Sequence, residues 1–244
     1  MLSRVKSHGL NGIGGFGVQV ETDIANGLPA FEIVGLPDAA VRESRERVRA
    51  AIKNAGYVFP AARITVNLAP ADMRKEGAVY DLPVALSILA ASGQLGPRPN
   101  LEFVAFGELG LDGGVRAIAG ALPMVIDAYS EGEAVFAVPE GNAEEAAYVE
   151  GVSILPVTTL AQLCDHVRGD AAIAPHPVER WQGGETRYAT DFSEIKGQQG
   201  AKRAAEIAIA GGHNILLIGT PGAGKTMLAR AIPSILPQLT YEES

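Results

Sequence analysis

The chain has 244 residues, of which 47% are apolar and 20% charged, a balance typical of a globular protein that buries a sizeable core. Its formal net charge of −8 argues against a protein that coats nucleic acid through bulk charge, but it leaves room for a local basic patch. Cys164 is the only cysteine and no apolar run approaches the roughly 20 residues that cross a bilayer, so we expect a protein of the reducing cytoplasm without a disulfide or a membrane partner.

The first predicted elements are two strands and a helix. Residues 18–23 alternate apolar and polar side chains with the period of a strand, and Asn26-Gly27 is a turn signal. Residues 30–34 are therefore predicted to return as the second strand of a hairpin. A helix follows Pro37-Asp38 and ends near Gly56. Its buried stripe is predicted to comprise Val41, Val48, Ile52 and Ala55.

The rest of the front half mixes strands and helices. In chain order, the predicted elements are strand 63–68, helix 82–91, strand 103–106, a turn at 113–114, helix 121–130, strand 134–138, helix 143–150, strand 153–156 and helix 159–167. Because the chain opens with a hairpin rather than a strand–helix–strand unit, residues 1–168 are predicted to form one α/β domain with a mixed sheet.

The composition changes at residue 169. Residues 169–190 are rich in proline, glycine and polar side chains and show no sustained period, so they are predicted to be a linker. A long loop of one domain is the alternative, but structureless loops of more than roughly 15 residues are uncommon inside compact domains. Residues 191–244 are then predicted to begin a second α/β domain. Its predicted elements are helix 199–210, strand 214–218 and helix 226–232.

A phosphate-binding pattern lies between the last two of these elements. It is the segment Gly219-Thr220-Pro221-Gly222-Ala223-Gly224-Lys225-Thr226, which fits G-x-x-x-x-G-K-[ST]. Glycines let the backbone wrap around a phosphate so that its N–H groups converge on the anion. Lys225 is predicted to contact the β- and γ-phosphates of ATP, and the Thr226 hydroxyl to bind Mg²⁺. A chance glycine-rich turn is the alternative, but the preceding strand and the following helix favour a P-loop.

The segment before the P-loop indicates a class of ATPase. Residues 191–198 resemble the segment that precedes the P-loop in AAA+ ATPases, where residues matching Ile195 and Gly197 help to hold adenine. Ordinary core packing of Ile195 is the alternative. Efficient hydrolysis also needs an acidic pair at the end of a further strand and a neighbour's arginine, which we expect beyond Ser244. The chain is therefore predicted to be the front part of a longer protein and to bind ATP without hydrolysing it efficiently by itself.

Several segments of the front domain together resemble one family. They are residues 34–44, 66–72, 75–77, 80–83 and 107–109, with the sequences VGLPDAAVRES, VNLAPAD, KEG, YDLP and GEL. Taken together, they are similar to the N-terminal part of the ComM/YifB group of magnesium-chelatase-like AAA+ ATPases. This resemblance implies a ring-forming, hexameric motor that uses ATP and Mg²⁺ to move on DNA, with helicase-like branch migration in natural transformation.

The front domain is also similar in fold to the proteolytic domain of Lon, which uses a serine nucleophile and a lysine base. The position that matches the serine is Val79, and the position that matches the lysine is Leu122. Neither side chain can attack a carbonyl or accept a proton, and the nearby Ser87 has no lysine in the matching segment. The front domain is therefore predicted to be non-proteolytic, with a displaced working pair as the alternative.

The helix after Pro37 carries a row of basic residues that are candidate DNA contacts. The row consists of Arg42, Arg45, Arg49 and Lys53. Glu43 and Glu46 interrupt it, so a solvated helix face is the favoured interpretation. The four histidines are scattered without metal-ligand spacing, and the sequence therefore predicts no zinc site.

The leading hypothesis for function is an ATP-driven DNA-remodelling motor. A metal-insertion ATPase subunit of the chelatase type is the second, and the fused front domain argues against it. In a third hypothesis the front domain docks a protein partner and does not touch DNA, and the fourth is a Lon-like ATP-dependent protease. Stimulation of the ATPase by branched DNA would separate the first from the second, and DNA binding by residues 1–168 would separate the first from the third.

Overall fold

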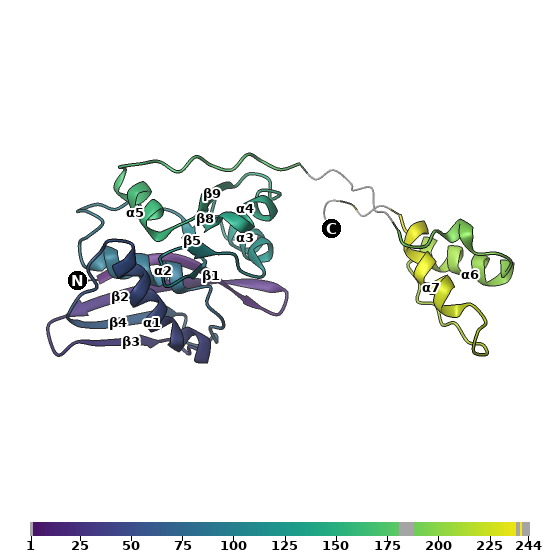
Figure 1. Ribbon diagram of the computed structural model, residues 1–244, viewed down its shortest axis with the longest axis horizontal. Helices are drawn as coiled ribbons and strands as arrows, with labels where there is room; N and C mark the ends of the chain where they lie inside the picture. Colours follow the sequence, from purple (N-terminus) through teal and green to yellow (C-terminus); the bar gives the residue numbers. More distant parts are fainter. Residues whose placement is uncertain (1, 181–187, 238–239, 241–244) are drawn as a thin grey trace. The chain divides into compact units, whose positions relative to one another are not determined.

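The computed structural model describes residues 2–180, 188–237 and 240, which fall into two compact units. The first unit spans Met1–Arg180 and the second spans Trp181–Ser244. The first unit consists of a central sheet with helices packed on it, so the mixed α/β class predicted from the sequence is confirmed (Figure 1).

A seven-stranded sheet forms the centre of the first unit, in the order β3-β4-β2-β1-β5-β8-β9 (Figure 1). β2 pairs antiparallel with β1 and with β4, and the other neighbouring pairs are parallel. The sheet is therefore mixed, as predicted. Its strands are β1 Leu2–Asn11, β2 Gly14–Ala25, β3 Ala30–Val34, β4 Arg63–Ala69, β5 Val104–Ala105, β8 Val135–Pro139 and β9 Ser153–Val157.

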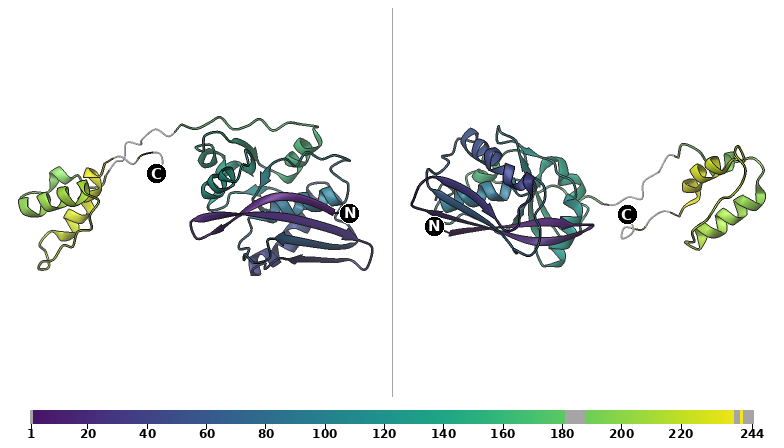
Figure 2. Two further views of the ribbon diagram at one scale, coloured as in Figure 1. Left: turned by 180° about the vertical axis from the view of Figure 1, so that it is seen from behind. Right: turned by 90° about the horizontal axis from the view of Figure 1, so that it is seen from below.

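The predicted hairpin of residues 18–23 and 30–34 is wrong. β3 lies at the edge of the sheet, parallel to β4, and β4 separates it from β2. Helix α1, Ala39–Asn54, connects β3 to β4 and makes the three a strand–helix–strand unit. Alternation determines the two faces of a strand but not its partner, so the pattern could not exclude this pairing. The observed hairpin joins β1 and β2, the two longest strands (Figure 2).

Helices cover both faces of the sheet. Neighbouring residues of β8, such as Phe136 and Ala137, belong to different core clusters because successive side chains of a strand point to opposite faces. One cluster joins α1, α2 and α5 to the sheet, and the other joins α3 and α4 to it. These helices are α2 Asp81–Ala91, α3 Ala121–Ser130, α4 Glu140–Ala146 and α5 Leu160–Arg168.

The predicted helices of the first unit form close to their expected bounds. α1 is followed by Gly56 at a φ of +87°, a left-handed conformation that glycine adopts without strain. α4 differs most from its prediction, because it begins at Glu140 and ends before the predicted range does. A short hairpin of β6, Glu108–Leu109, and β7, Val115–Arg116, encloses the predicted turn at 113–114. No helix within the described residues is long and apolar enough to span a bilayer.

The first part of the predicted linker packs on the first unit. Ile173 is buried and belongs to the core cluster of α1, α2 and α5. The backbone N–H of His176 donates to the carbonyl of Ile154 at 2.7 Å. Residues 181–187 of the predicted linker lie outside the described residues. The chain thus remains attached to the first unit for some distance beyond the end of α5.

Within residues 188–237, the second unit contains two α-helices and two short 3-10 helices around a small core. The core cluster consists of Phe192, Ile195, Ala205, Leu228 and Ala231. The elements are η1 Phe192–Glu194, α6 Gln199–Ala210, α7 Lys225–Ala231 and η2 Ile232–Ile235.

The strand predicted at residues 214–218 does not form. Leu216 and Ile218 are exposed, at 81% and 86% of their surface, and within residues 188–237 no strand is present to pair with this segment. A strand is stabilised by hydrogen bonds to a neighbouring strand, so an apolar run alone does not create one. The apolar run nevertheless lies directly before the P-loop segment, as the motif requires.

Candidate phosphate-binding site

The P-loop segment, residues 219–226, forms a turn that leads into α7. Gly222 and Gly224 both have a φ of +81°, which residues with a Cβ rarely adopt. Gly224 is also the N-cap of α7, and the N–H of Ala223 donates to the carbonyl of Thr220 at 3.3 Å. The backbone conformation of this turn therefore depends on two of the glycines that the motif supplies.

Lys225 folds back over the turn. Its Nζ donates to the carbonyls of Gly219 and Thr220, both at 2.7 Å. The side chain of Lys225 is half-buried, while Thr226 next to it is exposed. The ammonium group already lies against the loop, and the charged oxygens of a phosphate are stronger acceptors than the two carbonyls.

A cavity of about 540 Å³ lies beside the turn. Residues of the P-loop segment, including Lys225, form one side of it. Ile195, Gln198 and Leu217 contribute to its other walls. Small-molecule sites typically enclose roughly 300–1,000 Å³, so the cavity is large enough for a nucleotide.

Ile195 packs in a core and lines the cavity at the same time, so the predicted adenine contact stays a prediction. It is 7% exposed and packs in the core of the second unit, and it also lines the cavity. The amine of Lys202 donates to the carbonyl of Ile195 at 3.2 Å, which fixes this part of the chain. Gly197 has a φ of +68° and is not a lining residue, whereas Lys196 and Gln198 on either side of it are.

Val79 and Leu122, the positions predicted to match the serine and lysine of Lon, carry apolar side chains packed in the first unit. Val79 and Leu122 are partly buried against the core cluster of α3 and α4. Ser87 is fully buried in α2, where its Oγ donates to the carbonyl of Val84 at 2.9 Å and lies 2.5 Å from Oγ1 of Thr22. Among the described residues no lysine forms a hydrogen bond with this hydroxyl.

The candidate DNA contacts on α1 have no carboxylate partner within the described part of the chain. These contacts are Arg42, Arg45, Arg49 and Lys53. Arg45 donates to the carbonyls of Arg42 and Phe31, at 3.0 and 3.3 Å. Glu43 and Glu46, which interrupt the row in the sequence, form no ion pair among the described residues either. The four cations therefore keep their charge available to solvent or to an anion.

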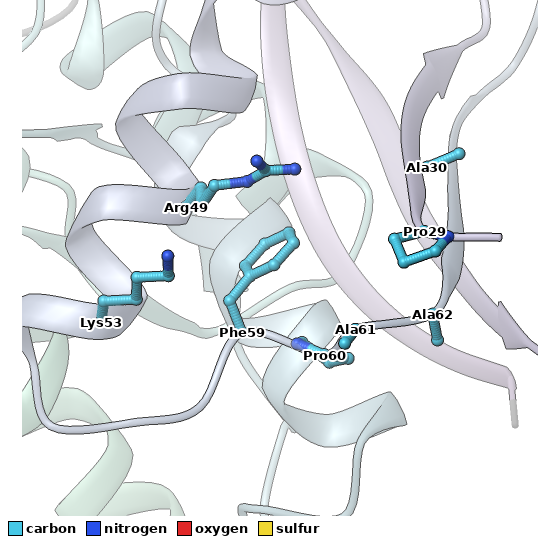
Figure 3. A pocket seen from close by; sticks show the side chains of 8 residues that line it. All are labelled: Pro29, Ala30, Arg49, Lys53, Phe59, Pro60, Ala61 and Ala62. Atoms are coloured by element: carbon cyan, nitrogen blue, oxygen red, sulfur yellow. The ribbon is translucent and has the colours of Figure 1, made fainter.

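A small apolar cavity of about 180 Å³ lies at one end of this basic row (Figure 3). Pro29, Phe59 and Pro60 contribute apolar walls, and Arg49 and Lys53 supply the only charges in its lining. The guanidinium of Arg49 lies over the ring of Phe59, 5.0 Å from its centroid. Its Nε is buried and has no hydrogen-bond partner among the described residues. A buried donor without an acceptor costs free energy, so an anion that reached it would be favoured.

Arg47 belongs to the same helix but has a structural role. Its guanidinium donates to both carboxylate oxygens of Asp81, at 2.7 and 3.2 Å. Asp81 is 0% exposed, and burial raises its pKa to about 6 although Arg47 acts in the opposite direction. The N–H of Leu109 also donates to this carboxylate, so the pair joins α1, α2 and β6. Because 34 residues separate Arg47 from Asp81, no local pattern indicates this contact.

The two units together define a class of protein: a mixed α/β unit followed by a unit that carries a P-loop sequence beside a nucleotide-sized cavity. Comparison with known families makes this more specific. The family described as subunit ChlI of Mg-chelatase matches residues 20–142, and the one described as magnesium chelatase, subunit ChlI, matches residues 191–244. The chain belongs to this Mg-chelatase ChlI family.

Individual relatives match along nearly the whole chain. YifB of Escherichia coli K12 is 42% identical over 244 residues, which is 100% of this chain and 47% of YifB. Rv2897c of Mycobacterium tuberculosis is 43% identical over 244 residues, which cover 100% of this chain and 48% of Rv2897c. Competence protein ComM of Haemophilus influenzae is 41% identical over 234 residues, and the match covers 93% of this chain and 45% of ComM. The predicted resemblance to the ComM/YifB group is thus confirmed, and the chain spans about half the length of these curated relatives.

Proposed function

We propose that this chain is the ATP-binding portion of a magnesium-chelatase-like AAA+ ATPase. The observation that carries the proposal is the position of Lys225, folded over a glycine-dependent turn at the wall of a cavity of about 540 Å³. ATP would place its phosphates against the turn and its base toward Ile195. Membership of the Mg-chelatase family supports the use of a nucleotide.

In this proposal each group of the P-loop has one role. The backbone N–H groups of the turn, from residues 219–224 other than Pro221, bind phosphate oxygens, and Lys225 exchanges its two carbonyl acceptors for the β- and γ-phosphates. Mg²⁺, when bound with ATP, neutralises phosphate charge, and the exposed Thr226 hydroxyl is the group that would hold it. Glu194 is the single acidic residue lining the cavity among the described residues. We therefore propose that the 244-residue chain by itself binds ATP and hydrolyses it slowly.

Replacement of Lys225 tests the nucleotide site. Lys225→Ala removes the one ammonium at the turn, and we expect Mg-ATP affinity to fall at least about tenfold, since the cost of losing a charge-assisted contact is roughly 1.5–3 kcal/mol. The measurement is isothermal titration of the 244-residue chain with Mg-ATP. Lys53→Ala on α1, far from the P-loop in sequence, is the matched control and should bind as the unmodified chain does. Equal affinity in Lys225→Ala and the unmodified chain would refute the site.

For the whole protein we propose an ATP-driven DNA-remodelling motor that acts in natural transformation or recombination. The support is the uncompensated row of Arg42, Arg45, Arg49 and Lys53 on α1, together with similarity to a competence protein. A homo-oligomer, a hexameric ring, in the cytoplasm is part of the same proposal. The test is ATP hydrolysis by the full-length protein with and without forked DNA, and a rate that DNA leaves unchanged would count against the motor.

The family description also supports a second candidate, a metal-insertion subunit of the chelatase type. The two candidates differ in what should stimulate hydrolysis. Branched DNA stimulates a DNA motor, whereas a porphyrin-binding partner stimulates a chelatase subunit. If only the porphyrin-binding partner stimulates hydrolysis, the protein is a metal-insertion subunit.

A further inference from the structure

A second group of chemically active side chains lies in the first unit, at the end of the β1–β2 hairpin. It consists of His8 on β1, Asp127 on α3 and Glu131 directly after α3. One ligand-type atom of each residue lies within 4.8 Å of the other two. Because 119 residues separate His8 from Asp127, spacing along the chain could not indicate this group, and the sequence predicted no zinc site.

The histidine is held firmly inside this group. The side chain of His8 is 2% exposed, and its Nε2 lies 2.7 Å from Oδ2 of Asp127. Asp127 and Glu131 are four residues apart at the end of α3, so their side chains lie on the same face of the helix. Glu131 is exposed and has no ion-pair partner within the described part of the chain. A buried imidazole thus faces one partly buried carboxylate and one free carboxylate.

Two glycines on the neighbouring strand leave the space that the group occupies. Gly17 on β2 lies directly opposite His8 in the register, and a Cβ there would be 3.1 Å from Oε2 of Glu131. A Cβ at Gly15 would be 2.7 Å from the Cβ of Asp127 and 2.9 Å from Cδ2 of His8. Larger side chains at both positions would separate the three ligands, so the strand is shaped to bring them together.

A cavity gives access to the group of His8, Asp127 and Glu131, and the two carboxylates of the group suit a cation. A cavity of about 360 Å³ is lined by His8, Gly17 and Glu131. Lys6, which also lines it, is paired with Glu133 at 2.6 Å. Among the described residues no lysine or arginine forms an ion pair with Asp127 or Glu131. The two carboxylates supply negative charge and the imidazole a nitrogen donor, a combination that a divalent cation can use.

We propose that His8, Asp127 and Glu131 bind a divalent transition-metal cation. One imidazole nitrogen and two carboxylate oxygens fit Zn²⁺ or Mn²⁺ better than Mg²⁺, which prefers oxygen ligands, and water completes the coordination. The bound ion would join the end of the β1–β2 hairpin to α3. This site is separate from the P-loop, and it needs no nucleotide.

The test is titration of the nucleotide-free 244-residue chain with ZnCl₂, followed by isothermal calorimetry and by metal analysis after dialysis. We expect one Zn²⁺ per chain. Glu131→Gln removes a ligand without removing any contact of the folded protein, and it should weaken Zn²⁺ binding at least about tenfold. Glu46→Gln, which removes one exposed carboxylate from α1 on the opposite face of the sheet, should change the affinity less than about twofold.

Thermal unfolding gives a second, independent readout. Zn²⁺ should raise the unfolding midpoint of the unmodified chain, since a ligand that binds only the folded state stabilises it. Glu131→Gln should have an unchanged midpoint without metal and no increase with it. If the unmodified chain binds no Zn²⁺, or if Glu131→Gln binds it equally well, the proposal is wrong and the group is only a hydrogen-bonded histidine–aspartate pair.

Discussion

At the scale of single residues, the Arg47–Asp81 pair controls stability inside the first unit. Asp81 is 1% exposed at its side chain and Arg47 is 24% exposed. Burial of the carboxylate is unfavourable, and the two hydrogen bonds from Arg47 offset that cost. The folded-state pKa of Asp81 is raised to about 6 from its ordinary value of 3.8. The folded protein therefore takes up this proton before the unfolded chain does as pH falls.

This pair gives a pH-dependent prediction. Arg47→Met leaves the carboxylate of Asp81 buried without its cation, and at pH 7.5 we expect the free energy of unfolding to fall by about 3 kcal/mol. Because the folded state binds the proton more tightly, the contribution of Asp81 to stability increases as pH falls from about 7 toward 4. Because Arg47 lowers the pKa of Asp81, its removal should raise that pKa further, so the variant gains more stability on protonation than the unmodified chain does. The deficit of Arg47→Met should therefore shrink at pH 5, as measured by urea unfolding at both pH values.

Arg45→Met is the matched control, because Arg45 belongs to the same helix and forms no ion pair within the described residues. We expect it to change stability by less than about 0.5 kcal/mol at either pH. A deficit of the same size at pH 7.5 and pH 5 in Arg47→Met would show that removal of Arg47 does not raise the pKa of Asp81.

At the scale of elements, α1 combines two different surfaces. Val41, Val48 and Ile52 form a buried stripe against the sheet. Asp38 caps the helix by accepting a hydrogen bond from the N–H of Val41 at 2.7 Å. The basic row lies outside the buried stripe, so a change to its side chains leaves the contacts of that stripe in place. Replacement of Arg49 removes in addition its contact with the ring of Phe59.

The basic row therefore gives a prediction about binding and not about folding. Arg49→Gln combined with Lys53→Gln should weaken binding of forked or single-stranded DNA about tenfold in low salt. Loss of two phosphate contacts should also reduce the dependence of log affinity on log salt concentration by about 2. Fluorescence anisotropy of labelled DNA at several salt concentrations measures both effects.

Arg63→Gln combined with Arg116→Gln removes the same charge from exposed residues that have acidic partners, at 3.9 and 3.4 Å. This control should retain most of the affinity. If both double variants lose affinity equally, DNA responds only to net charge. If the two double variants and the unmodified chain all fail to bind DNA, the first unit is better explained as a module that docks a protein partner.

At the scale of the whole molecule, the first unit continues beyond α5. Ile173 is 8% exposed, and its N–H donates to Nδ1 of His166 at 3.0 Å. Further along, the N–H of Glu179 donates to the carbonyl of Ala147 at 3.1 Å. Residues 169–180 were part of the predicted linker, yet contacts of this kind belong to a folded unit.

The extent of the first unit can be tested by comparing two lengths of chain. Residues 1–180 should be more stable than residues 1–168 by about 2 kcal/mol, since burial of one isoleucine side chain contributes roughly 1.5–3 kcal/mol. Urea unfolding of both proteins measures the difference. Ile173→Ala in residues 1–180 should reproduce most of the loss, and equal midpoints for the two lengths would place residues 169–180 outside the unit.

The family and the class of fold followed from the sequence because both depend on short, local patterns. The segment 219–226 is continuous, and helices such as α3 and α6 occupy their predicted ranges because helical periodicity is set by neighbouring residues. The strand patterns were also correct for β3 and β9. The sequence was less informative about the function of each surface, since Glu43 and Glu46 on α1 did not indicate that the four cations of the basic row lack ion-pair partners within the described residues.

Residue order alone thus determined the position of most helices, where phosphate is expected to bind and which family the chain resembles. Only the tertiary structure decided that β4 separates β3 from β2, that Arg47 is paired with Asp81 and that His8 meets Asp127 and Glu131. The physical reason is separation along the sequence. Periodicity and turn chemistry depend on residues a few positions apart, whereas strand partners and ligand clusters form when distant segments pack together.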